Sequence, residues 1–231
     1  MSLISERVNA LAASATLAMS QKSAELRAQG VDVINMSVGE PDFDTPGFIK
    51  EAAKRAIDDN FTRYTPVAGY LSLREAICDK LTRENGFDYK PSQIVVGNGA
   101  KQELCNVLLA TVNPGDEVII PVPAWVSYLE MVKLAEGKPV TIHAGVESDF
   151  KITAPMLEEA ITPRTKVVMF NSPSNPTGSV YSYEELRALA EVLERHPEVI
   201  VLSDEIYEHI NFVDKIHSIS SFGNLKDRTV V

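Results

Sequence analysis

Short apolar runs rich in valine and isoleucine alternate with amphipathic segments through the middle of the chain. Strands that read as nearly continuous Val and Ile runs, separated by helices, are typical of a parallel sheet that is buried on both faces. The pattern therefore predicts an α/β fold with a mostly parallel sheet covered by helices on both faces. Ser182 and Glu185 have the spacing of a capping box, which marks the start of one helix. The expected strands are 93–96, 117–121, 138–143, 165–170 and 198–207, and the expected helices are 100–111, 125–136 and 182–195.

The two ends of the chain differ from this middle region. Residues 1–30 predict a flexible arm followed by a helix over 15–29, and residues 31–231 form the expected large domain. At the other end, the β-branched run 229–231 begins what reads as one more strand and stops there. Because domains rarely end inside a core strand, we expect the domain to be incomplete, although a short terminal edge strand would also explain the run.

Composition and charge narrow the classes of function. The chain has 231 residues, of which 45% are hydrophobic, so it can bury a sizeable core. It carries 22 basic and 32 acidic residues, for a net charge of −10, and it has no cluster of Lys and Arg. Such a chain is a poor candidate for binding nucleic acid. No apolar run approaches the length of a membrane span, so we expect no membrane partner.

The cysteines and histidines give no sign of a disulfide framework or a metal site. Cys78 and Cys105 both lie in helical patterns, which favours a cytoplasmic protein with reduced thiols. The start of the chain lacks a basic segment followed by an apolar one, so we expect no secretory signal. The four histidines are scattered without the spacing of zinc ligands and read as surface or packing residues.

The loop 97–102, Gly-Asn-Gly-Ala-Lys-Gln, joins an expected strand to an expected helix. Small residues let a backbone approach an anion closely, and the free N–H groups of a helix N-terminus then hold a phosphate. The third glycine of a dinucleotide fingerprint and the acid after its next strand are missing, which argues against a nicotinamide dehydrogenase. Taken alone, the loop is equally well explained as an anion cradle or as a tight turn.

Three further residues with chemical potential follow expected strands, where ligands bind in parallel sheets. Asp204 closes an apolar run and is either a turn former or a functional acid. Trp125, the only tryptophan, is either core packing or a flat surface for a planar ligand. Asn175 precedes a proline in a turn-rich loop, which restrains its backbone to an extended geometry. Together with the loop 97–102, these strand ends supply parts suited to a planar, phosphorylated, protonatable ring.

Several ordered motifs resemble those of class I aminotransferases of the aspartate aminotransferase fold, and the resemblance covers the whole chain. The subgroup that the chain resembles most is the bacterial aspartate or aspartate/prephenate aminotransferases. The resemblance implies the large domain of a pyridoxal 5′-phosphate-dependent transferase of fold type I. The motifs are Val-Gly-Glu-Pro-Asp-Phe at 38–43, Arg-Tyr-Thr-Pro at 63–66, the loop 97–102, Asn-Ser-Pro-Ser-Asn-Pro-Thr-Gly at 171–178 and Ser-Asp-Glu-Ile-Tyr-Glu-His at 203–209.

The resemblance implies roles for four residues around the cofactor ring. Asp204 would pair with the pyridine nitrogen and keep it protonated, so that the ring acts as an electron sink. Tyr207 and Asn175 would hydrogen-bond the ring hydroxyl oxygen, and Trp125 would stack on the ring face. The family pattern also implies cis peptide bonds at two active-site turns, before Pro123 and Pro176.

The resemblance implies further contacts to the phosphate and to the substrate's α-carboxylate. The backbone of Gly99, Ala100 and Lys101 would cradle the phosphate. Tyr64 would reach the phosphate of a neighbouring subunit, which implies a homodimer with shared sites. Gly39 would contact the α-carboxylate of an amino-acid substrate through its backbone, and the substrate would also touch Trp125 and Asn175.

The same resemblance bears on substrate choice. Lys101 would meet the distal carboxylate of a dicarboxylic substrate, with Ser14 and Thr16 helping to close the arm over it. A cation facing a carboxylate in a dry site discriminates against neutral side chains. The alternative is that Lys101 is simply solvated. We therefore expect an amino group to pass between aspartate or glutamate and a 2-oxo acid, by way of pyridoxal phosphate.

The chain departs from the family pattern in lacking the Schiff-base lysine, which would follow the strand that begins at Thr229, and the later arginines. Lys215 and Lys226 lie in the wrong motifs to replace that lysine. We therefore expect these 231 residues to lack transaminase activity by themselves, truncated before the lysine and the C-terminal small domain. Two alternatives remain, namely another enzyme of the same fold, such as a lyase or synthase acting on amino acids, and a non-catalytic fragment or binding module.

Overall fold

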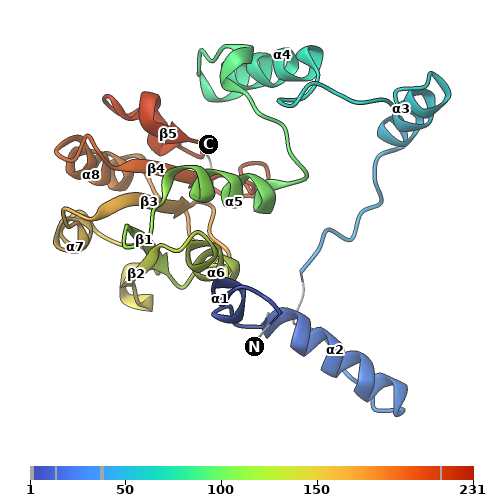
Figure 1. Cartoon of the computed structure of the whole chain (residues 1–231), viewed down its shortest axis with the longest axis horizontal. Coiled ribbons are helices and arrows are strands. Elements are labelled where there is room, and N and C mark those ends of the chain that lie inside the picture. The colour runs from blue at the N-terminus through green and yellow to red at the C-terminus, as the bar shows by residue number, and fades with distance from the viewer. Residues whose placement is uncertain (1–2, 14, 37–38, 214) are drawn as a thin grey trace.

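A five-stranded parallel sheet forms the centre of the computed structural model, which describes residues 3–13, 15–36, 39–213 and 215–231 (Figure 1). The strand order is β2-β1-β3-β4-β5, and every neighbouring pair runs parallel. Most side chains of β1, β3 and β4 are buried, as near-continuous apolar strands require. The strands are β1 Glu117–Val122, β2 Lys138–His143, β3 Thr165–Asn171, β4 Ile200–Asp204 and β5 Thr229–Val230.

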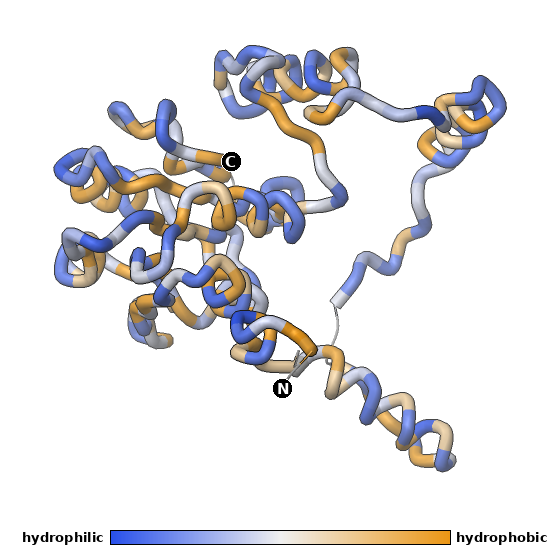
Figure 2. The backbone as a smooth tube through the Cα atoms, viewed as in Figure 1, coloured by the Kyte–Doolittle hydropathy of each residue, from blue (hydrophilic) through white to orange (hydrophobic). Residues whose placement is uncertain are grey.

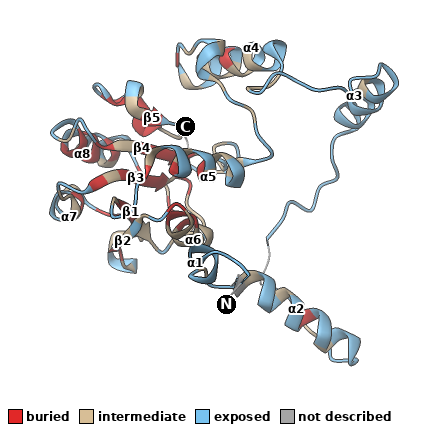
Figure 3. Cartoon of the chain, viewed as in Figure 1, coloured by how far each residue is buried: buried red, intermediate tan, exposed pale blue. Residues whose placement is uncertain are grey.

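Helices cover the two faces of this sheet and complete three layers. Alternate residues of each strand face opposite layers, so Val118 and Ile119 of β1 belong to different apolar clusters. One cluster joins the sheet to α5 and α6, and the other joins it to α7 and α8, with the buried residues concentrated in and around the sheet (Figure 3). The fold class predicted from the sequence is therefore confirmed. The helices are α5 Ala100–Thr111, α6 Ser127–Leu134, α7 Ala154–Ala160 and α8 Tyr183–Glu194.

The N-terminal helices lie largely outside these layers. The helices α2, α3 and α4 project away from the sheet on long connections, and α3 lies farthest from it (Figure 1). None of the side chains of α3 is buried, although apolar residues such as Phe48 and Ile57 lie along it (Figure 2). The bounds are α1 Glu6–Asn9, α2 Ala15–Ala28, α3 Gly47–Asp58, α4 Leu71–Lys80 and a π-helical turn Leu81–Asn85. Short 3-10 turns cover Pro91–Gln93, Val146–Ser148, Ile219–Ser221 and Leu225–Arg228.

One predicted element, the strand at 93–96, is wrong. Pro91–Gln93 form a 3-10 turn, and residues 94–97 have no regular secondary structure. A strand needs a hydrogen-bonded neighbour, and this segment pairs with no strand of the described sheet. Val96 N donates instead to Ala68 O at 3.2 Å, and Val95 is 62% exposed. The segment does have the apolar composition of a strand, but composition does not reveal whether a neighbouring strand is available for hydrogen bonding.

The other predicted elements are confirmed to within a few residues. Ser182 caps α8 as predicted, because its Oγ accepts a bond from Glu185 N at 3.3 Å while Ser182 N donates to Glu185 Oε2 at 2.7 Å. The run 229–231 contributes the short edge strand β5, which pairs with Val201 and Leu202 of β4. In the described part of the chain, no helix has the length and apolar content needed to cross a bilayer.

Candidate cofactor site at the carboxyl edge of the sheet

A cavity of about 520 Å³ lies where the carboxyl ends of β1, β3 and β4 meet the start of α5, and we name it the sheet-edge cavity. Parallel sheets bind ligands at this edge because loops from several strands converge there. Eight of the residues predicted for the cofactor or substrate line it together, although they are spread over most of the chain. They are Thr16, Gly39, Ala100, Lys101, Trp125, Asn175, Asp204 and Tyr207.

Asp204, the last residue of β4, is a buried acid held by three hydrogen bonds. The residue is only 9% exposed. Its Oδ2 accepts from the hydroxyl of Tyr128 at 2.7 Å, and its Oδ1 accepts from Ile206 N at 3.2 Å. Its backbone oxygen accepts from Asn171 Nδ2, at the end of β3, at 2.9 Å. The bond from Ile206 is the one that a turn former would accept, and the bond from Tyr128 ties the carboxylate to a separate helix at the cavity wall.

Tyr128, on α6, is a site residue that the sequence interpretation missed. It is 3% exposed, and it lines the cavity beside its partner Asp204. Burial, followed by the nearby charge of Asp204, raises the pKa of this phenol well above its usual range, so Tyr128 stays a neutral donor. In the sequence, Tyr128 is one position in an amphipathic helix and reads as core. The only available signal was general, namely that a buried tyrosine hydroxyl needs a partner.

Trp125 forms one wall of the cavity and contacts two neighbouring side chains. Its ring meets that of Tyr128 edge-on, with centroids 5.5 Å apart and an interplanar angle of 88°. Lys101 Nζ lies 4.7 Å from the centroid of the Trp125 ring, a cation–π distance. Trp125 is therefore neither plain core nor free surface, and Lys101, although exposed to solvent, lies against the Trp125 wall of the cavity.

The loop after β3 is built around Asn171 and Asn175. Asn171 Oδ1 accepts from Asn175 N at 2.6 Å, so one side chain joins the loop to both β3 and Asp204. The peptide bonds before Pro123 and Pro176 are cis, as the family resemblance implied. A third cis bond, before Pro173, was not predicted.

The start of α5 has the geometry that either a tight turn or an anion cradle would have. Gly99 is the N-cap residue, with φ of 91°, a conformation that L side chains rarely adopt. Gly99 supplies no capping side chain, so the first N–H groups of α5 are left for a ligand or water. Asn98 N, just outside the helix, donates to Gln102 Oε1 at 2.6 Å, which stabilises the turn. Ala100 and Lys101, the first residues of α5, line the cavity.

Two predicted residues remain outside this arrangement, and one cannot be placed. Tyr64 is fully exposed and does not line the sheet-edge cavity. Gly99 adjoins the cavity through Ala100 but is not one of its lining residues. Ser14 lies outside the described residues.

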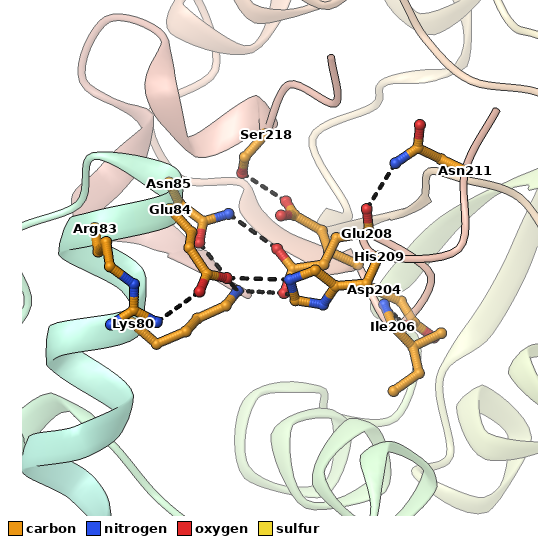
Figure 4. A network of polar contacts seen from close by, with 11 residues as sticks. Lys80, Arg83, Glu84, Asn85, Asp204, Ile206, Glu208, His209, Asn211 and Ser218 are labelled. Carbon is orange, nitrogen blue, oxygen red and sulfur yellow. Dashed lines mark hydrogen bonds and ion pairs between the residues drawn. The ribbon is translucent and has the colours of Figure 1, made fainter. Parts of the chain in front are cut away.

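A polar network holds the loop after β4 from its other side (Figure 4). Lys80, at the end of α4, forms an ion pair with Glu208, and Asn85 Nδ2 donates to the second oxygen of Glu208 at 3.0 Å. His209 Nε2 lies 3.0 Å from Glu84 Oε2. The loop that carries Tyr207 is thus anchored to an N-terminal element far away in sequence.

Glu205 anchors the same loop to the segment before β5. Its Oε1 accepts from the hydroxyls of Ser203 at 2.8 Å and Ser218 at 2.5 Å. Burial raises the pKa of Glu205, and the two serine bonds offset part of that effect. Asp204 and Glu205 are neighbours in sequence but differ in their contacts. Asp204 lines the cavity, while Glu205 joins two backbone segments.

Comparison with known proteins identifies the family once this geometry is in view. The family model described as "Aminotransferase class I and II" matches residues 31–230, so the chain belongs to that family. Enzymes of this family depend on pyridoxal 5′-phosphate. The prediction of the family and of its cofactor from sequence motifs is therefore confirmed.

Curated relatives show which members of this family the chain is similar to. The chain is 56% identical over 214 residues to an aspartate/prephenate aminotransferase of Cereibacter sphaeroides, covering 93% of this chain and 54% of the relative. It is 50% identical over 230 residues to an aspartate/prephenate aminotransferase of Nitrosomonas europaea, covering 99% of this chain and 58% of the relative. The chain thus spans about half the length of the curated relatives that it matches.

Solved structures agree with this placement. The chain resembles an aspartate aminotransferase from Rhizobium meliloti with a TM-score of 0.95 and 44% identity, over 99% of this chain and 58% of the other. It resembles the Thermus thermophilus aspartate aminotransferase with maleate with a TM-score of 0.94 and 45% identity, over 99% of this chain and 59% of the other. At these levels the likeness covers both the sheet and the elements around it.

Proposed function

We propose that the sheet-edge cavity binds pyridoxal 5′-phosphate, and that the chain is the cofactor-binding part of an aminotransferase acting on dicarboxylic amino acids and 2-oxo acids. The observation that carries the proposal is the convergence of an acid, an aromatic wall, an amide and a helix N-terminus on one cavity. The first three parts lie at or just after the ends of β4, β1 and β3, and the fourth is the start of α5. Each matches a different feature of the cofactor, namely its ring nitrogen, ring face, ring oxygen and phosphate.

The environment of Asp204 supports a cationic ligand. A buried carboxylate is costly unless it is paired, and in the described part of the chain no basic side chain forms an ion pair with Asp204. Its hydrogen bonds come from a phenol and a backbone N–H, both of them neutral. A protonated ring nitrogen in the cavity would supply the missing positive charge. When bound, pyridoxal phosphate supplies an electron-withdrawing ring whose nitrogen this carboxylate keeps protonated.

The other lining residues would orient the ring. Trp125 offers a flat face, held at its edge by Tyr128. Asn175 and Tyr207 offer an amide and a phenol to an oxygen substituent, from the loops that follow β3 and β4. The free N–H groups at the start of α5 suit a dianionic phosphate, because the helix dipole adds to their hydrogen bonds.

A titration tests cofactor binding directly. Pyridoxal phosphate added to the chain should produce a saturable change in absorbance. Asp204→Asn, which keeps the shape but removes the charge, should weaken binding by about tenfold or more. Asp79→Asn, on the exposed surface of α4, is the matched control and should bind as the unaltered chain does. Borohydride treatment followed by peptide mapping should find no single modified lysine. Equal affinity of Asp204→Asn and the unaltered chain would contradict the proposal.

Lys101 supports a preference for dicarboxylic substrates. Among the described residues that line the sheet-edge cavity it is the only lysine, and its Nζ lies against the ring of Trp125. The relatives are named for aspartate and prephenate, and the similar Thermus structure was solved with maleate, a dicarboxylate. A cation at this position would pair with the carboxylate farther from the reacting carbon.

Ligand pairs that differ in one carboxylate test this role. The chain loaded with pyridoxal phosphate should bind maleate more tightly than maleamate, in which one carboxylate is an amide. Lys101→Gln should reduce that preference by about tenfold. Lys50→Gln, on α3, removes a lysine outside the cavity and should leave the preference unchanged. The role is excluded if Lys101→Gln retains the full preference in calorimetric titrations.

The oligomeric state of the protein and its cellular compartment stay predictions. We infer a homodimer in which the N-terminal elements of one subunit cover another, and Tyr64, which is fully exposed, would reach the neighbouring phosphate. The exposed apolar side chains of α3 support such a contact. Two free cysteines, Cys78 and Cys105, suit a reducing cytoplasm.

A further inference from the structure

Tyr128 and Asp204 form a buried pair that joins two separate elements at the wall of the sheet-edge cavity. Tyr128 lies on α6, and Asp204 ends β4, 76 positions later in the sequence. Their hydroxyl and carboxylate oxygens are 2.7 Å apart, the usual length of a well-formed O–H···O hydrogen bond. Both residues are at least nine-tenths buried, so water cannot easily replace the bond.

The two oxygens of Asp204 are held by different donors. Oδ2 accepts from Tyr128, and Oδ1 accepts from Ile206 N. The bond to Ile206 is local and belongs to the turn itself, while the bond to Tyr128 comes from another helix. Of these two bonds, only that from Tyr128 therefore fixes the carboxylate relative to a separate element, α6.

The ring of Tyr128 has a second contact, separate from that of its hydroxyl. It packs edge-on against Trp125, at 5.5 Å between centroids. Tyr128 thus contacts both Asp204 and Trp125, through its hydroxyl and its ring respectively. The two contacts can be separated experimentally, because phenylalanine keeps the ring and loses the hydroxyl.

We propose that Tyr128 is a positioning residue whose hydroxyl aims the Asp204 carboxylate at the ring nitrogen of the bound cofactor. The inference rests on the proposed binding of pyridoxal phosphate. If it holds, the hydroxyl contributes to affinity only when the ligand has a basic nitrogen for Asp204 to meet. A tyrosine that merely filled the core would stabilise the site equally for any ligand of the same shape.

Two ligands and three variants test this inference. The ligands are pyridoxal phosphate and its 1-deaza analogue, in which carbon replaces the ring nitrogen, and affinities are measured by absorbance titration of the chain. Tyr128→Phe should weaken binding of pyridoxal phosphate by about tenfold and change binding of the analogue by less than about twofold. In the Asp204→Asn background, Tyr128→Phe should have no further effect on either ligand.

The outcomes separate the two proposals. If Tyr128→Phe weakens both ligands equally, or neither, the positioning role is wrong while cofactor binding stands. If the effect of Tyr128→Phe persists in full without the Asp204 carboxylate, the hydroxyl does not act through Asp204 and the inference is also wrong. If the unaltered chain shows no saturable binding of pyridoxal phosphate, the proposed function fails and the role of Tyr128 fails with it.

Discussion

Glu117, a buried carboxylate at the start of β1, lies at the edge of the sheet opposite the cavity. It is 2% exposed and accepts three side-chain bonds, from Thr162 at 2.6 Å, Arg164 at 2.8 Å and Lys138 at 3.0 Å. Lys138 opens β2, while Thr162 and Arg164 lie in the turn before β3. A single residue therefore joins the amino ends of three adjacent strands.

These bonds make the contribution of Glu117 to stability depend on pH. The hydroxyl of Thr162, then Lys138 and Arg164, lower the pKa of Glu117 from 4.5 to about 2. A carboxyl group whose pKa is lower in the folded state stabilises the fold at pH values above its unfolded pKa. That contribution is full above about pH 5 and is lost as the pH falls from about 4.5 towards 2.

Replacing Glu117 with Gln should lower the free energy of unfolding by about 2 kcal/mol at pH 7, because the charged acceptor of three donors is removed. The gap between the two proteins should narrow below about pH 4.5. Urea unfolding followed by the fluorescence of Trp125, the only tryptophan, measures both effects. Glu159→Gln, on the exposed side of α7, is the control and should change stability by less than about 0.5 kcal/mol. A gap that does not vary with pH would show that Glu117 acts through its shape alone.

At the level of elements, the sequence predicted what depends on local pattern. The strands β1 to β4, the helices α5, α6 and α8 and the Ser182 capping box all have signals within a few residues of one another, whereas the short helix α7 was not predicted. The convergence of strand ends also followed from the sequence, because parallel strands must place their carboxyl ends at one edge. Asp204, Asn175 and Trp125 were therefore predicted to lie at this edge, and they do line the cavity there.

What could not be predicted depends on contacts between distant elements. The segment 93–96 has the composition of a strand, but whether it pairs depends on a neighbour that no local pattern reveals. Tyr128 has the pattern of a core residue, and only the docking of α6 beside β4 brings its hydroxyl to Asp204. Glu117 likewise reads as the polar start of a strand, and its donors lie 21 to 47 positions away.

The whole chain exposes far more surface than a compact monomer of its size. Its accessible area is 14923 Å², whereas a folded monomer of 25.3 kDa exposes about 10,300 Å². Much of the excess comes from N-terminal elements that project from the sheet (Figure 3). At 100° per residue, Phe48 and Ile49 of α3 fall on an apolar face, and Lys54 falls on the opposite, charged face. Since an uncovered face of this kind is typical of an interface, we expect it to contact a second copy of the chain.

Sedimentation equilibrium should find the unaltered chain as a dimer, and Phe48→Glu with Ile49→Glu should shift it towards monomer by weakening association at least about tenfold. The reason is that two charges would have to be buried in an apolar contact, whereas neither side chain is buried within the single chain and its own fold should survive. Lys54→Glu makes the same change in net charge on the opposite face of α3 and should leave the dimer intact. Circular dichroism confirms that all three proteins keep their helices, because a variant that lost α3 would also lose the surface under test. A monomeric unaltered chain at the concentrations used, or a dimer that tolerates both glutamates, would show that α3 is not the interface.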